Sequence, residues 1–187
     1  MLTTVIGVAA TTFTTRALDG ESAPPVSTGE TVPLPFPPSR LISSERIGHY
    51  QVEADGSLDG AMVALGSPTD MRATGDTCTV SWTAEGVEMR FYTHGGQDPC
   101  MYGQFCSASL YGGDWATTKG LQRAESVRRM WKLYPEAEKV EEPGEVTRWV
   151  LERGTALCGR DARGGLEALT ASGKVVAFWV SFLAGGD

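Results

Sequence analysis

The stretch CTVSWTAEGVEMRF, residues 78–91, decides the fold. Val80 and Trp82 alternate with polar residues, and so does every second residue from Val87 to Phe91 after the segment TAEG. Alternation with a period of two is typical of a half-buried strand, and a short glycine-containing connection between two such runs is typical of a hairpin. The stretch therefore predicts two antiparallel strands that share one apolar face.

Apolar residues with helical spacing occur twice in the chain, once before this hairpin and once well after it. Both runs follow the pattern i, i+3, i+4 and i+7, which places the side chains on one face of a helix. Ser57 can cap the first helix, with Asp55 as the other candidate, and Pro135 ends the second. The spaced residues are Leu58, Ala61, Met62 and Leu65 in the first run and Val127, Met130, Trp131 and Tyr134 in the second.

Strand-like segments follow each helix. After the second helix they cover residues 146–151, 165–171 and 174–183. We therefore expect an α+β fold built as a tandem repeat of a helix followed by an antiparallel meander. The helices would pack on one face of the sheet and leave the other face open to solvent.

The predicted domain organisation has three parts. Residues 1–17 begin with the apolar run MLTTVIGVAATTF, too short for a membrane span, and predict a degenerate export segment or a disordered Thr/Ala-rich tail. Residues 18–45 hold six of the ten prolines and predict a Pro-rich disordered tether. Residues 46–187 would form a single globular domain of two repeats, at about 46–95 and 115–183, joined by a disulfide-stapled loop.

The four cysteines predict two disulfide bonds. Their spacing matches neither a zinc site nor a CxxC redox motif, and an even number of widely separated cysteines is typical of exported domains. Three pairings are open, and we favour Cys78 with Cys100 and Cys106 with Cys158. The expected location is therefore secreted or extracytoplasmic, in the cell envelope.

Aromatic residues gather around the glycine-rich segment that links the two repeats. Large rigid side chains on a stapled loop suit a partner-binding surface. The alternative is that these side chains cover the edge of a small core. The candidates are Tyr92, Tyr102, Phe105, Tyr111 and Trp115.

Charge and composition restrict the partners. The formal net charge is −7, and nucleic acids or anionic membrane surfaces need clustered Lys and Arg. We expect a protein or cell-wall partner, no nucleic acid, no membrane span and a monomeric state.

Catalytic and metal-binding motifs are absent from the sequence. It contains no HExxH, no P-loop and no G-x-S-x-G, and the acidic residues between 136 and 145 lack the spacing of a calcium loop. We expect no cofactor, no metal ligand and no catalytic residue. An alternative is a small hydrolase in which His94 acts with Asp98 or Asp114.

A set of short motifs resembles a group of secreted or envelope proteins from actinobacteria. Its repeat unit is similar to that of β-lactamase-inhibitor proteins and of small outer-membrane assembly lipoproteins. The resemblance covers about residues 45–183 and implies a tandem architecture, disulfides and a binding role, without site residues. The motifs are Cys78-x3-Trp82, Gly86-x4-Phe91, Asp98-Pro99-Cys100, Trp115-x-Thr117-x2-Gly120-Leu121, Ser126-Val127, Leu133 to Ala137, and Gly173-Lys174-Val175-x-Ala177-Phe178.

Together these features favour a non-enzymatic secreted or cell-envelope binding module, with a protein inhibitor as one version. The main alternative is a structural or assembly component of the cell envelope. The small hydrolase using His94 is a third, weaker hypothesis.

Overall fold

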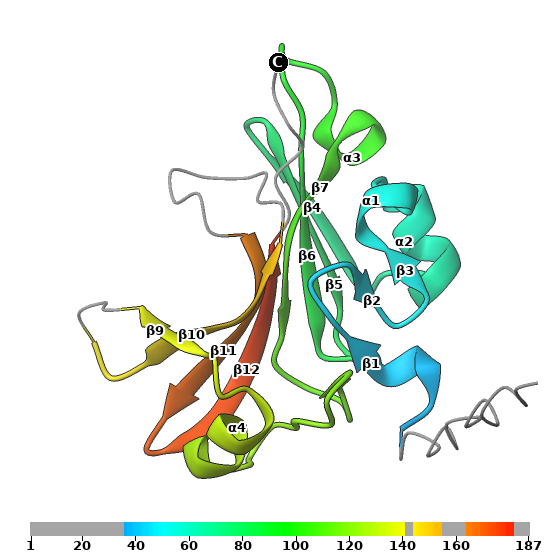
Figure 1. The fold of residues 1–187 in the computed structure, drawn as a ribbon. Helices are drawn as coiled ribbons and strands as arrows, with labels where there is room; N and C mark the ends of the chain where they lie inside the picture. Colours follow the sequence, from blue (N-terminus) through cyan, green and yellow to red (C-terminus); the bar gives the residue numbers. More distant parts are fainter. Residues whose placement is uncertain (1–35, 141–143, 155–163, 182–187) are drawn as a thin grey trace, which may run out of the picture. The chain divides into compact units, whose positions relative to one another are not determined.

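An eight-stranded antiparallel sheet is the main element of the computed structural model, which describes residues 36–140, 144–154 and 164–181 (Figure 1). The strand order is β4-β5-β6-β7-β12-β11-β10-β9. The strands are β4 (Asp70–Thr74), β5 (Thr77–Trp82), β6 (Val87–Tyr92), β7 (Gln104–Leu110), β9 (Glu138–Val140), β10 (Thr147–Gly154), β11 (Gly164–Ala171) and β12 (Lys174–Ser181).

A second, smaller sheet has the order β3-β2-β1-β8. Three of its strands come from the start of the described chain, and the fourth comes from beyond β7. The pairing of β1 with β8 is parallel, whereas the other two pairings are antiparallel. The strands are β1 (Leu41–Ile42), β2 (Arg46–Ile47), β3 (Tyr50–Gln51) and β8 (Ala116–Thr117).

The helices of the described chain are short. As predicted, Ser57 caps one of them through a hydrogen bond from the Gly60 amide. Ser126, which was not predicted as a cap, caps another through the Arg129 amide. The helices of the described chain are the 3-10 turn η1 (Pro38–Arg40) and the α-helices α1 (Val52–Asp55), α2 (Leu58–Leu65), α3 (Pro99–Tyr102) and α4 (Val127–Leu133).

The predicted tandem α+β repeat is wrong. The linking segment between the supposed repeats contains β7, a seven-residue strand that pairs with β6 on one side and β12 on the other. The strands of both halves therefore join in one mostly β architecture, and in the described part of the chain no repeated layer of helices covers the sheet. The physical reason is that two separate meanders would leave two strand edges unpaired, and β7 with β12 removes both.

The hairpin predicted from residues 78–91 is present. Cys78 lies opposite Phe91, Val80 opposite Met89 and Trp82 opposite Val87, so the apolar residues of β5 and β6 share one face. All six of these side chains are buried. The period-two pattern thus placed both the strands and their buried face correctly.

One core lies on this face of the large sheet, and the small sheet contributes to it. Ile42, Ile47 and Tyr50 belong to the same buried cluster as the β5–β7 side chains. The rings of Tyr50 and Phe105 lie 5.6 Å apart. The tether predicted for residues 18–45 therefore ends too late, because β1 is already a buried strand of the fold.

Two glycines bring the β5–β6 loop against the segment after β7. Gly86 has a φ of +62°, and a Cβ added to it would lie 2.1 Å from the Gly112 Cα. The Gly86 carbonyl accepts hydrogen bonds from the amides of Tyr111 and Gly112. A side chain at residue 86 would therefore meet backbone atoms, which cannot move aside easily.

Gly86→Ala should lower the free energy of unfolding by more than about 2 kcal/mol, since left-handed strain and a backbone clash add together. Gly75→Ala is the matched control, because Gly75 has a φ of +57° with nothing within 4 Å of its added Cβ. It should cost about 1 kcal/mol. Urea unfolding measures both, and equal costs would contradict the close approach.

Two buried tyrosines, Tyr50 and Tyr134, hold their protons to unusually high pH. Burial is the main cause that raises each pKa well above the ordinary value of 10.0. The nearby carboxylates of Asp55 and Glu152 raise the two values further. Tyr134 also donates a hydrogen bond to Glu152 of β10, at 3.3 Å.

Stability should therefore fall as the pH rises through 10, because the unfolded phenols lose their protons first and the folded ones retain them. Each tyrosine should cost about 1.4 kcal/mol of unfolding free energy between pH 9 and pH 11, measured by urea unfolding.

In Tyr50→Phe the loss of stability between pH 9 and pH 11 should be about half as large. At neutral pH this variant should cost little, since the Tyr50 hydroxyl has no hydrogen-bond partner in the described chain. An undiminished alkaline loss would contradict this assignment, and the exposed Tyr111→Phe is the control.

Candidate functional site

The short helix α3 is stabilised by its capping residue and attached to the sheet by a disulfide bond. Asp98 accepts a hydrogen bond from the Cys100 amide at 2.9 Å, and Pro99 occupies the first turn. Proline suits this position because its missing N–H would be unpaired there in any case. The cap and the disulfide thus fix a helix of four residues, too short to be stable alone.

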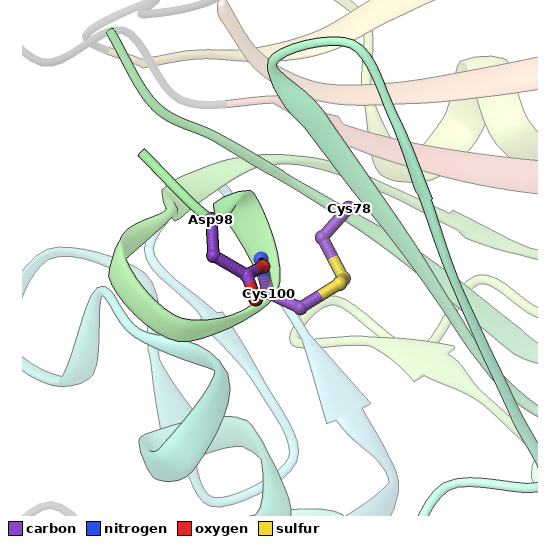
Figure 2. The surroundings of a disulfide bond; sticks show 3 residues. All are labelled: Cys78, Asp98 and Cys100. Carbon is purple, nitrogen blue, oxygen red and sulfur yellow. Dashed lines mark hydrogen bonds between the residues drawn. A yellow bond between two sulfur atoms is a disulfide. The ribbon is translucent and has the colours of Figure 1, made fainter. Parts of the chain in front are cut away.

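The disulfide joins Cys100 to Cys78 of β5, with 5.0 Å between the Cα atoms (Figure 2). Cys78 is fully buried, so α3 is bound to the core rather than to a surface loop. This is one of the two pairings favoured from the sequence. Cys106 is also in a disulfide bond. Because Cys158 lies outside the described residues, its pairing with Cys106 stays a prediction.

Two large side chains of α3 face solvent despite this attachment. Met101 is 69% exposed and Tyr102 is 56% exposed. The helix lies beside β4, β5 and β6, at the end of the large sheet (Figure 1). Exposed side chains of this size on a rigidly held backbone offer contact area that costs little conformational entropy to order.

The five aromatic candidates do not form one surface. Phe105 and Trp115 are buried in the core, so for these two the alternative of core coverage is correct. Tyr92, at the end of β6, is half-buried, and Tyr111 is 44% exposed. Of the five, Tyr102 is the most exposed.

Trp115 contacts the β5–β6 loop, which contains Gly86. Its indole N–H donates to the Glu85 carbonyl at 2.8 Å, and the Arg40 guanidinium lies 5.2 Å from its ring centroid. Arg40 also forms an ion pair with the Glu85 carboxylate. Trp115 therefore links the start of the small sheet to the β5–β6 loop and has a structural role.

The face of the large sheet opposite the core is mainly polar. Its central row crosses β5, β6, β7, β12 and β11. In that order, the residues are Ser81, Glu88, Ser109, the half-buried Trp179 and the buried Glu167. The Glu167 carboxylate pairs with Arg148 Nε at 3.5 Å. These residues were not among the predicted site residues, although most of them occupy the polar positions of the alternating strand pattern.

The hydrolase hypothesis gains no support from the geometry. The imidazole of the exposed His94 lies edge-on to the Tyr92 ring, with 4.8 Å between the centroids. Asp98 caps α3, and no hydrogen bond or ion pair joins it to His94. Asp114 is exposed and likewise forms no ion pair with His94. Within the described ranges, no group of three or more His, Cys, Asp or Glu residues could hold a metal ion.

Among residues 36–140, 144–154 and 164–181, no helix is long and apolar enough to span a membrane.

Comparisons with known proteins do not place the chain in a family. No family model matches it, and neither does any curated protein. One solved structure is similar, an extracellular protein containing a SCP domain from Bacillus anthracis str. Ames, with 11% identity and a TM-score of 0.41. The match covers 68% of this chain and 43% of that chain. A likeness at this score supports no inference about the fold or function of this chain. The resemblance noted from the sequence motifs stays a prediction.

Removal of the disulfide in Cys78→Ala/Cys100→Ala should cost about 3 kcal/mol of unfolding free energy, because the bond closes a loop with a sequence separation of 22. The amides of α3 should then exchange with solvent faster than those of β5. Asp98→Ala, which removes the cap alone, is the control and should cost about 1 kcal/mol. Urea unfolding and amide hydrogen exchange measure these effects. A double variant no less stable than Asp98→Ala would contradict the role assigned to the disulfide.

Proposed function

We propose that this protein is a non-enzymatic binding module of the extracytoplasmic space, secreted or in the cell envelope. It would contact a protein or cell-wall partner through α3. The observation that carries the proposal is the exposure of Met101 and Tyr102 on a helix that is covalently attached to the core.

The attachment matters for affinity. A partner that binds a mobile loop must order it, at about 0.5–1.5 kcal/mol for each flexible side chain and more for the backbone. In α3 the backbone is already fixed by the Asp98 cap and the Cys78–Cys100 disulfide. Tyrosine also adds one polar group to a large apolar ring, which suits a surface that is wet when free and dry when bound.

The disulfide supports the location. Disulfide bonds persist outside the reducing cytosol and are rare within it. None of the described cysteines is free. This argues for an exported protein independently of residues 1–17, which lie outside the described part of the chain.

The inhibitor version of the hypothesis rested on the tandem repeat, which the fold lacks. A structural component of the envelope remains the main competing hypothesis. The two differ in where the protein is found: a free binding module enters the medium, whereas a structural component stays with the envelope after salt washing.

Capture experiments test the proposal directly. The purified protein, carrying a photo-crosslinker, is incubated with envelope extract and with culture medium, and the captured proteins and glycans are identified. Tyr102→Ala and Met101→Ser should each reduce capture at least tenfold, which corresponds to about 1.4 kcal/mol.

The control is Tyr111→Ala, because Tyr111 is similarly exposed but lies outside α3. Its capture should equal that of the parent protein. Equal capture by all three variants, or no captured partner in either fraction, would overturn the proposal.

A further inference from the structure

The outer edge of β4 is a regular strand edge that contains neither a bulge nor a proline. All five residues of β4 are exposed, and their register with β5 runs from Asp70 to Thr74 without a shift. Within the described chain, no strand pairs with the other side of β4. Natural proteins commonly protect such edges with bulges, prolines or very short strands, because unpaired N–H and C=O groups recruit other strands.

The opposite edge of the sheet is formed by β9 and is protected by the short length of this strand. Strand β9 has three residues, all of them at least partly exposed. Arg153 of the neighbouring β10 binds the Glu138 carboxylate of β9 at 2.6 Å. An edge of only three residues is a poor template for a further strand.

The turn between β4 and β5 determines which backbone groups of β4 point outward. Thr74 and Thr77 flank a two-residue connection in which Gly75 has a φ of +57°, as in a tight hairpin. The residues beside such a turn form a hydrogen-bonded pair, and pairs alternate along an antiparallel ladder. Asp70, Arg72 and Thr74 therefore direct their backbone groups to β5, whereas Met71 and Ala73 direct theirs to the free edge.

We propose that β4 pairs antiparallel with β4 of a second copy of this chain, with the two-fold axis at Met71. In this register Asp70 lies opposite the partner's Arg72, and Arg72 lies opposite the partner's Asp70. The two Met71 residues, each 52% exposed, meet on the core side of the combined sheet. The edge is thus self-complementary in backbone hydrogen bonds, in charge and in apolar surface.

Charge selects this register over its neighbour. A shift that places the axis at Arg72 would pair the outward backbone groups of Met71 with those of the partner's Ala73, but it would set the two Arg72 side chains directly opposite each other. Like charges in directly opposed positions destabilise a strand pair, whereas opposite charges stabilise it. The axis at Met71 forms two favourable pairs in place of one unfavourable pair.

The dimer is expected to be weak, because five residues per strand provide a small interface. A dissociation constant of about 10–100 µM is appropriate for this size. The proposal goes beyond the binding function and does not depend on it. It also replaces the monomeric state expected from the sequence.

Sedimentation velocity of the full-length protein over a range of concentrations measures dimerisation, and variants with reversed charges in β4 test the proposed pairing. Asp70→Arg and Arg72→Asp should each raise the dissociation constant at least tenfold, since each sets like charges opposite each other. An equimolar mixture of the two variants should recover dimers, because every opposed pair is then again an acid with a base. Arg90→Asp is the control for net charge, since Arg90 lies two strands inside the edge, and it should dimerise as the parent does.

Cysteine crosslinking tests the register. Met71→Cys should form a disulfide-linked dimer under mild oxidation, whereas Ala73→Cys should not, because the two Ala73 residues would lie about four residues apart along the strands, beyond disulfide reach.

Three results would overturn the proposal. The first is a protein that stays monomeric at all concentrations up to about 500 µM. A monomer whose Met71 and Ala73 amides are protected from exchange by another segment of the same chain also belongs to this first result. The second is a dimer that the β4 variants leave unchanged. The third is crosslinking through Ala73→Cys alone.

Discussion

The pairing of β7 with β12 is the interaction on which the rest of the structure depends. Leu110 lies opposite Phe178, and Ala108 lies opposite Val180, so residues about 70 positions apart share one ladder. This contact turns two groups of four strands into one sheet with one core. Without it, β7 and β12 would each present an open edge, and the apolar residues of both halves would lose their common face.

Local pattern predicted the local structure well. The period-two alternation of residues 78–91 predicted the hairpin and its buried face, and the helical spacing predicted α2 and α4, with Ser57 as a cap of α2. The global arrangement was missed because β7 reads poorly as a strand. Its sequence QFCSASL is rich in small and polar residues, and it follows a glycine-rich segment. Its strand state comes from the neighbours on both sides, a long-range effect that local propensity does not contain.

The candidate site was partly predictable for the same reason. The cysteines indicated a stapled loop, and the Cys78–Cys100 bond now fixes α3 on the core. Which aromatic residues face solvent could not be read from composition, since Phe105 and Trp115 have the same character as Tyr102 and Tyr111. Burial depends on the side of a strand and on the small sheet, whose β1 and β8 come from distant parts of the chain. The exposed β4 edge was likewise invisible until the strand order was known.

Native-state hydrogen exchange in increasing denaturant tests the central claim most directly. If β7 and β12 join the two halves into one sheet, the slowest amides of β5–β7 and of β10–β12 should share one free energy of exchange and one dependence on denaturant. Two separate values, one for each group of strands, would show two independently folding repeats and would contradict the account.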